Sequence, residues 1–498
     1  MLKIIKGEGE TYADNGDCYI RRLSCSDDTD RHLFYKASHS SESDYWTAGK
    51  SINTFVGAFA LFAALASSSS LMGAVGSGVA LGVPFLFAYG FGAVAILPFT
   101  LFLVSGQIRR SGVNTLPEFF KQRYGKAVQI VAVAIVVIGM TFYMVPQLTA
   151  SGLIGSHVLG IDYTTAVIVL GIGFTVYAAL GGMWAITYTD LIQGSVMLVG
   201  MLILAGIILV QHDGFSSLIQ DALAVTPAFG DITQPWMSYF GLFLAFLWFG
   251  IVSPSAVMRN FASRDAKTAR RSAMWACLLY LLIFVFGLIV AAGGASLGIA
   301  DTLDNQDMIF VSVIENYMSP FLAGIMLAGL LAAIMSSADA MLLAISAGVA
   351  RDIYKEYINK EASEKTITKI GFTVMIIASI IGIIIAINPP QLIAIMVGWV
   401  GGFLLSSFGF PLVLGIWWNR ANKAGALAGI LGGALTFLIL VITKPFALVS
   451  EPIIASPVSL VLVIVVSLLT QSPSAETQKL VNRYHTNLPE SDEEKTAG

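Results

Sequence analysis

The segment Ala328–Tyr354, AGLLAAIMSSADAMLLAISAGVARDIY, decides the fold class of this chain. It is apolar and long enough to cross a bilayer, yet it carries Ser336, Ser337 and Asp339 near its middle. A carboxylate at that depth costs about 2.5–3.5 kcal/mol unless it faces a cavity, an ion or a partner. Because hydroxyl and carboxylate oxygens suit small hard cations, we expect a cation site in this helix. The alternative is a closely packed helix whose serines bond to their own backbone.

The composition of the whole chain agrees with a multi-pass membrane protein. Of its 498 residues, 56% are hydrophobic and 12% are charged, and the net charge of −3 gives no indication of a nucleic-acid partner. Apolar runs of about 20 residues predict twelve transmembrane helices. These are expected near residues 53–80, 83–105, 127–151, 162–181, 186–210, 237–258, 273–298, 320–350, 368–388, 391–417, 424–443 and 452–470. A shorter amphipathic run, Met308–Tyr317, is expected to lie on the membrane surface.

Loop charges predict the orientation of these helices in the plasma membrane. Lys and Arg gather in the loops 106–126, 259–272, 351–369 and 418–423, whereas the loops on the opposite side together contain only Lys444. By the positive-inside rule the first set is cytoplasmic, and both chain termini are then cytoplasmic. This distribution of Lys and Arg leaves neither residue inside the first eight predicted spans. An anionic solute would therefore have to be held by helix ends, hydroxyls or a co-bound ion.

Two of the predicted spans contain helix breakers at corresponding positions, five helices apart. The first span has four consecutive serines, Ser67–Ser70, and the sixth has Gly250 followed by Ser253 and Pro254. Serine competes for backbone hydrogen bonds, and proline removes an amide donor. Matched breaks of this kind are typical of transporters made of two inverted repeats, with the binding site at the breaks. The alternative is the ordinary use of glycine and proline in membrane helices.

Three further stretches of the sequence are distinctive: DYWTAGKSI (44–52), GGMWAITYTDLIQGSVML (181–198) and FGFPLVLGIWWNRANKAGALAG (408–429). Together they resemble the sodium:solute symporter family, which includes proline, pantothenate, acetate, sialic acid and sugar transporters. The serine-bearing eighth span is a fourth point of likeness, and the resemblance runs from about residue 44 to residue 470. In the last stretch Phe410 is an extra residue beside Pro411 when compared with the family signature.

The resemblance implies an all-α LeuT-like fold and sodium-driven alternating access. The transporter domain would cover 44–470, between a polar N-terminal tail, 1–43, and a cytoplasmic C-terminal tail, 471–498. Its inverted repeats would span 53–210 and 237–417, followed by the trailing helices 424–443 and 452–470. Sodium is the expected coupling ion, with no organic cofactor. Family members normally begin with an extra helix, which the polar tail does not resemble, and we expect this tail to be disordered.

The resemblance also assigns the ion sites, residue by residue. The main sodium site would use backbone carbonyls and hydroxyls of Ala63, Ala66, Ala333, Ser336 and Ser337. A second sodium site would use Asp190 and Asp339. The family pattern has serines just after the hydroxyl pair, where this chain has Asp339 and Ala340. For Asp190 the alternative is a helix N-cap.

The solute is expected at the broken first span. The candidate residues are Ser67, Ser68, Ser69, Ser70, Tyr89, Trp248 and Phe249, of which the two aromatic residues at 248–249 could equally serve helix packing. Leu65 replaces the aspartate of the proline-transporting branch, and Ser70 and Tyr89 replace the amide and acid of the sugar branch. The chain therefore looks nearest to carriers of monocarboxylates such as acetate or pyruvate. The alternatives are a symporter for a proline-like amino acid or for pantothenate and, remotely, a membrane receptor; no motif indicates an enzyme.

Overall fold

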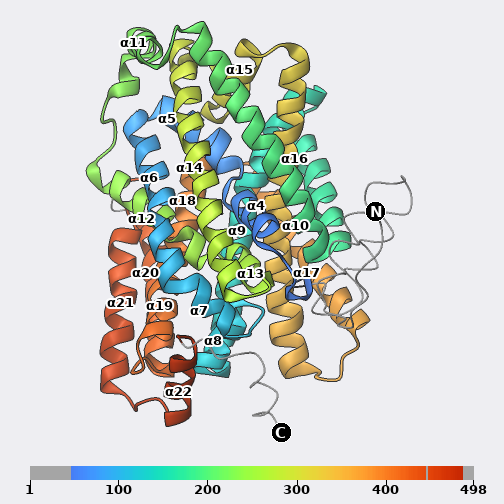
Figure 1. The fold of residues 1–498 in the computed structure, drawn as a ribbon, viewed down its shortest axis with the longest axis vertical. Coiled ribbons are helices and arrows are strands. Elements are labelled where there is room, and N and C mark those ends of the chain that lie inside the picture. The colour runs from blue at the N-terminus through green and yellow to red at the C-terminus, as the bar shows by residue number, and fades with distance from the viewer. Residues whose placement is uncertain (1–45, 47, 445–446, 486–498) are drawn as a thin grey trace, which may run out of the picture.

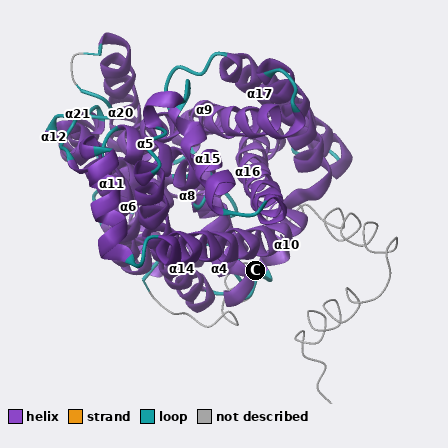
Figure 2. Ribbon diagram, turned by 90° about the horizontal axis from the view of Figure 1, so that it is seen from above, coloured by secondary structure: helices purple, strands orange, loops and turns teal. Residues whose placement is uncertain are grey.

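The computed structural model describes residues 46, 48–444 and 447–485. The predicted tail 1–43, with its expected disorder, lies outside this part of the chain. Figure 1 shows a bundle of helices, and Figure 2 shows it from above, with loops joining the helix ends. Within the described residues there is no β-strand, only one isolated bridge between Ile52 and Ser263. The all-α prediction is therefore confirmed.

Ten helical spans are long and apolar enough to cross a membrane, or eleven when one bent pair is counted as a span. The bent pair joins α4 (Thr54–Leu65) to the segment Ser69–Ala80. The ten spans are α9 (Lys126–Leu159), two parts of α10 (Tyr163–Met183 and Ile186–Gln211), α12 with α13 (Trp236–Ala262), α14 (Ala266–Ser296), α16 with η7 (Pro320–Ile358), α17 (Glu364–Ile387), α18 to α19 (Ile393–Trp417), α20 (Lys423–Thr443) and α21 (Pro452–Leu469).

The predicted count of twelve differs from the structure at the second span, 83–105. This stretch consists of α6 (Val83–Phe99), the π-helical turn η3 (Thr100–Val104) and α7 (Ser105–Arg110). Val104, which closes η3, has φ −131° and ψ −56°, outside the α-helical region. No single helix here reaches the length of the other spans, because the wide turn interrupts the apolar run.

Both predicted helix breaks are present. In the first span the two halves are bent by 58°, and Ala66 at the end of α4 has φ −85° and ψ 88°. The chain then re-enters a helix through the π turn η2 (Ser69–Gly73) and α5 (Ala74–Ala80). In the sixth span α12 (Trp236–Val252) stops at Ser253, and α13 (Pro254–Ala262) begins with the proline. Proline suits the first position of a helix, where its missing N–H costs nothing.

Two further features bend or widen the long helices. Helix α10 (Tyr163–Gln211) is kinked at Gly182, whose φ of 59° and ψ of −175° are readily adopted only by glycine. Besides η2 and η3, π-helical segments occur at η7 (Ala347–Ile358) and at η8 (Leu405–Gly409), which leads directly into α19 (Phe410–Trp417). Such turns are rare and occur frequently at functional sites.

Shorter elements close the two ends of the bundle. Figure 1 shows α11 (Phe215–Val225) and α15 (Ile309–Tyr317) at one end and α8 (Leu116–Tyr124) and α22 (Ala475–Arg483) at the other. Single 3₁₀ turns are η1 (Ala48–Lys50), η4 (Pro227–Gly230), η5 (Ala300–Thr302) and η6 (Gln306–Met308). The helix predicted at 308–317 is present as α15, and its apolar residues Ile309–Val311 are fully buried against the rest of the protein.

The trailing helices pack closely against the rest of the bundle. A methyl group placed on Gly433 of α20 would lie 1.8 Å from the carbonyl oxygen of Ser406 in η8. A methyl group on Gly241 of α12 would lie 1.9 Å from the carbonyl oxygen of Val449, just before α21. Small residues allow this backbone approach, which supplies the dispersion contacts that hold membrane helices together.

Candidate functional site

A small pocket lies at the point where the two broken spans meet. It is lined by Leu65, Ser69, Ala93, Tyr143, Phe246, Phe249, Gly250, Tyr280 and Val397. Leu65 and Ser69 flank the first break, while Phe249 and Gly250 precede the second break at Ser253. The pocket volume is about 20 Å³, which is room for little more than one water molecule. In this conformation the pocket is therefore nearly closed around its lining.

A chain of hydroxyl groups crosses one wall of this pocket. The Tyr89 hydroxyl lies 2.8 Å from that of Tyr280 and 3.4 Å from Ser69 Oγ, and Ser67 Oγ is 3.3 Å from Ser69 Oγ. The Phe246 ring packs on Tyr89 with a centroid separation of 4.0 Å. Three predicted solute-site residues are thus brought together. Tyr280 was missed, because a single tyrosine in an apolar helix gives no distinguishing pattern.

The remaining predicted solute-site residues have different surroundings. Ser70 Oγ donates to the Ser67 carbonyl at 2.9 Å. Ser68 Oγ donates to the Pro146 carbonyl of α9 at 3.5 Å, and its backbone N–H donates to Gln147 Oε1 at 3.4 Å.

The two predicted solute-site residues of α12, Trp248 and Phe249, have different neighbours. Phe249 lines the pocket and meets Tyr143 edge to face, with centroids 5.0 Å apart. Trp248 instead packs on Phe410, with centroids 5.4 Å apart, and is not among the pocket-lining residues.

Three of the five predicted main sodium ligands, Ala63, Ala333 and Ser337, are brought together between the first break and α16 (Pro320–Ser346). Ser337 Oγ lies 3.4 Å from the Ala63 carbonyl oxygen and 3.2 Å from the Ala333 carbonyl oxygen. Both carbonyls and the hydroxyl are buried, as is Ala66, the first residue after α4. The Ser336 hydroxyl donates to Asp190 Oδ1. Carbonyl and hydroxyl oxygens gathered in this way can bind a small cation without contributing a fixed charge.

Asp190 is part of a buried ion pair. Arg259 donates to Asp190 Oδ2 from Nη2 at 2.8 Å and from Nε at 3.3 Å, and the two side chains are 2% and 0% exposed. The prediction that no cation is buried in the first eight spans is therefore wrong. Arg259 was counted in the loop 259–272, whereas α13 continues to Ala262 and carries it inside. The N-cap alternative for Asp190 is also wrong, since Asp190 lies inside the second part of α10 (Ile186–Gln211) and its oxygens accept from Arg259 and Ser336.

Asp339 is the other carboxylate in this region, and it is fully buried in α16. Neither of its oxygens has a hydrogen-bond partner among the residues that the structure describes. A buried carboxylate is costly unless it is paired, protonated or bound to a cation. Asp339 and not Asp190 is therefore the carboxylate here that lacks a protein partner.

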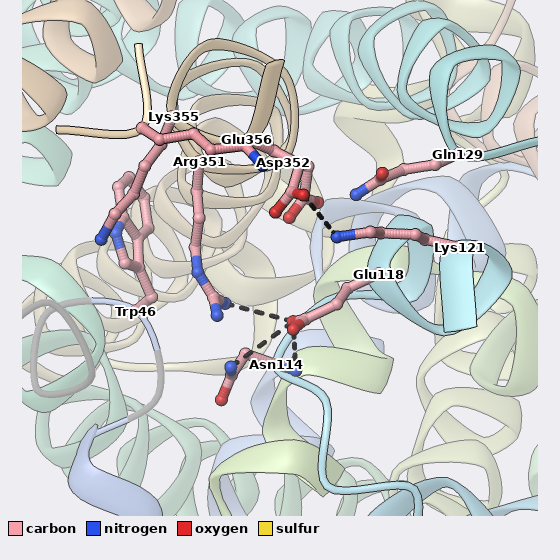
Figure 3. A pocket seen from close by; sticks show the side chains of 10 residues that line it. Trp46, Asn114, Glu118, Lys121, Gln129, Arg351, Asp352, Lys355 and Glu356 are labelled. Atoms are coloured by element: carbon pink, nitrogen blue, oxygen red, sulfur yellow. Dashed lines mark hydrogen bonds and ion pairs between the residues drawn. The ribbon is translucent and has the colours of Figure 1, made fainter. Parts of the chain in front are cut away.

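A charged cavity of about 420 Å³ opens at the α8 end of the bundle (Figure 3). Ion pairs join its two sides, α8 and η7: Lys121 to Glu356 at 2.6 Å and Arg351 to Glu118 at 3.4 Å. Asp352 accepts a hydrogen bond from Thr115 at 2.6 Å. The lining is completed by Trp46, Asn114, Gln129, Lys355 and Lys360.

The model of the sodium:solute symporter family matches residues 45–433. The chain belongs to the sodium:solute symporter family. This symporter is 29% identical over 461 residues to the osmoregulated proline transporter OpuE of Bacillus subtilis, covering 88% of the chain and 91% of the relative. It is 25% identical over 458 residues to the sodium/proline symporter of Escherichia coli, and this match covers 88% of the chain and 89% of the relative.

Solved structures give the same fold. A Na⁺-coupled sialic acid symporter in a substrate-bound outward-open state matches with a TM-score of 0.74 and 22% identity, over 89% of this symporter and 95% of that chain. MhsT in complex with L-phenylalanine matches with a TM-score of 0.55 and 13% identity, over 83% of this symporter and 98% of the MhsT chain. At these identities the likeness concerns the fold alone. The predicted LeuT-like architecture is thereby confirmed.

Proposed function

We propose that this symporter uses the sodium gradient to import a small amino acid of the proline type. The observation that carries the proposal is that the solute pocket and a cage of cation ligands, formed by Ala63, Ala333 and Ser337, share one break. Ala63 and Leu65 stand two residues apart at the end of α4, the first in the cage and the second in the pocket. The names of the two curated relatives, both proline carriers, support the amino-acid class.

Sodium binding would couple the two sites through the geometry of the first break. An ion held by Ala63, Ala333 and Ser337 would tie α4 to α16 next to the break at Ala66. The same ion contributes positive charge close to the pocket, where a substrate carboxylate can use it. Backbone groups freed at the break and the hydroxyls of Ser69 and Tyr89 would hold the remaining polar atoms.

An amino acid differs from a monocarboxylate by its amine, so the choice between them depends on whether the pocket can bind an ammonium group. The relatives favour the amino-acid alternative over the monocarboxylate hypothesis drawn from the sequence. A monocarboxylate such as acetate or pyruvate remains the second candidate, because the pocket lining contains no carboxylate to pair with an ammonium group and has Leu65 at the break. In an amino-acid carrier, backbone carbonyls at the breaks would have to accept from the amine.

Uptake by proteoliposomes containing the purified chain tests this proposal. Labelled proline should accumulate under an inward sodium gradient and not under a potassium gradient of equal size. Unlabelled proline should compete better than acetate, pyruvate, glucose or pantothenate. Stronger competition by acetate or pyruvate would transfer the assignment to the monocarboxylate class. Accumulation that ignores the sodium gradient would refute sodium coupling itself.

We also propose that the α8 end faces the cytoplasm and that Asp339 supplies the carboxylate of a second cation site. The basic loops around α8 support the orientation. The burial of Asp339 without a protein partner supports the second site. The second cation site is tested by measuring sodium and substrate fluxes together in the Asp339→Asn variant. Loss of this site should lower the number of sodium ions carried per substrate. An unchanged ratio would exclude Asp339.

A further inference from the structure

Three polar side chains form a continuous buried connection between α13, α10 and α16. Arg259 donates twice to one oxygen of Asp190, and Ser336 donates to the other. None of the three is more than 3% exposed. Arg259 Nη1 also donates to the Ser255 carbonyl at 2.9 Å, in the first turn after the second break. The connection therefore begins at the broken sixth span and ends at a predicted sodium ligand.

The direction of the Ser336 hydroxyl hydrogen matters for cation binding. A hydroxyl has one donor hydrogen and two acceptor lone pairs, and only the lone pairs can face a cation. Because Asp190 accepts the hydrogen, the lone pairs of Ser336 are left for the cage beside Ser337. A hydroxyl without this acceptor would have to give its hydrogen to a carbonyl of its own helix, as Ser337 does to Ala333.

The charge of Asp190 explains the presence of Arg259. An unpaired carboxylate at full burial would itself attract a cation and compete with the cage. The planar guanidinium offers several donors in a fixed arrangement, so it neutralises one carboxylate oxygen and leaves the other for Ser336. Asp190 can then act as a neutralised hydrogen-bond acceptor and not as a sodium ligand.

We propose that Arg259 and Asp190 are positioning residues for the sodium ligand Ser336, and that they make sodium affinity depend on the position of α13. This inference rests on the proposed sodium-coupled function. A displacement of α13 that carries Arg259 away would leave Asp190 unneutralised and would disturb Ser336. A solute-driven change at the second break thereby reaches the ion site through side-chain contacts as well as through the shared first break.

The test measures the sodium concentration that gives half-maximal thermal stabilisation of the purified full-length protein, a readout of ion binding that needs no transport. The main variant is Asp190→Asn/Arg259→Gln, which removes both charges together and so leaves no unpaired buried ion. We expect it to raise the half-maximal sodium concentration about tenfold, the usual consequence of weakening a hydrogen bond to a charged group. In a Ser336→Ala background the same pair should change it less than about twofold, because the positioned hydroxyl is gone.

Three single variants complete the design. Arg259→Lys keeps the charge but not the two-point contact, and it should give a smaller rise than Arg259→Gln. Arg123→Gln is the matched control, since Arg123 is also buried but donates to the Gly415 and Trp418 carbonyls. It should leave the half-maximal sodium concentration unchanged even if it lowers the melting temperature.

Equal effects of the double substitution with and without Ser336 would overturn the inference, because the pair would then act independently of that hydroxyl. Absence of an effect in both backgrounds would overturn it as well. Failure of the proposed function has a different signature. In that case the unaltered protein would show neither sodium-dependent stabilisation nor sodium-dependent uptake.

Discussion

Ser337→Ala should weaken sodium binding strongly while leaving the fold intact. The Ser337 hydroxyl lies within 3.4 Å of the Ala63 carbonyl and 3.2 Å of the Ala333 carbonyl, so it is the group that both halves of the cage share. Loss of one hydrogen-bonding group from a charged partner costs about 1.5–3 kcal/mol, which corresponds to about a 10- to 150-fold loss of affinity. The remaining carbonyls should still bind sodium, at correspondingly higher concentration.

Thermal unfolding of the purified protein over a range of sodium concentrations measures this loss. Ligand binding to the native state stabilises it in proportion to the logarithm of one plus the ratio of ligand concentration to Kd. The sodium-dependent rise in melting temperature should therefore begin at a 10- to 150-fold higher concentration, by the same estimate. Ser346→Ala is the matched control, since Ser346 is equally buried on α16 and its hydroxyl has no hydrogen-bond partner among the described residues. A sodium response of Ser337→Ala within twofold of that of Ser346→Ala would refute the assignment of the cage.

Three further substitutions test other parts of the structure. Gly433→Ala should lower stability by about 1–3 kcal/mol, seen as a lower melting temperature, because its methyl group would collide with the Ser406 carbonyl; Gly173→Ala, which meets open space, is the control. Tyr280→Phe removes the 2.8 Å partner of Tyr89 and should raise the half-saturating substrate concentration severalfold without shifting that of sodium; an equal shift in both would contradict its place in the solute pocket. Burial raises the pKa of Asp307 in η6 to about 7, so the stability this group contributes is full below its ordinary pKa and is lost as the pH rises through 7. Melting temperatures from pH 5 to 8 should consequently fall less in Asp307→Asn than in the unaltered protein, and parallel curves would count against this origin.

Much of the fold was predictable because hydropathy and helix breakers act locally. A run of apolar residues must form a helix in lipid, where its backbone has no other hydrogen-bond partners. Pro254 removes a backbone donor and clashes with the preceding turn, and four serines weaken their helix. These local causes explain why the second break was found at Ser253 and Pro254 and the first at the edge of the serine run.

The errors concern properties that depend on distant partners. Arg259 was assigned to a loop because charge normally ends a membrane span, but Asp190, 69 positions earlier, provides the counter-charge that buries it. Tyr280 could not be singled out, because its role depends on a hydroxyl 191 positions away. Sequence periodicity carries no information about such pairings.

The π turn η8 has a consequence for how the chain can vary in length. A helical turn closed by i→i+5 bonds holds one residue more than an α turn, so it takes up an inserted residue without rotating the helix that follows. Phe410, which the resemblance to the family signature marks as an extra residue beside Pro411, comes directly after η8 (Leu405–Gly409). An insertion here would be taken up within one turn, and α19 would keep its facing toward its neighbours. Deleting one residue from 405–410 should accordingly tighten η8 into an ordinary α turn, whereas the same deletion within α20 would turn Gly433 away from Ser406 and separate the surfaces that pack there.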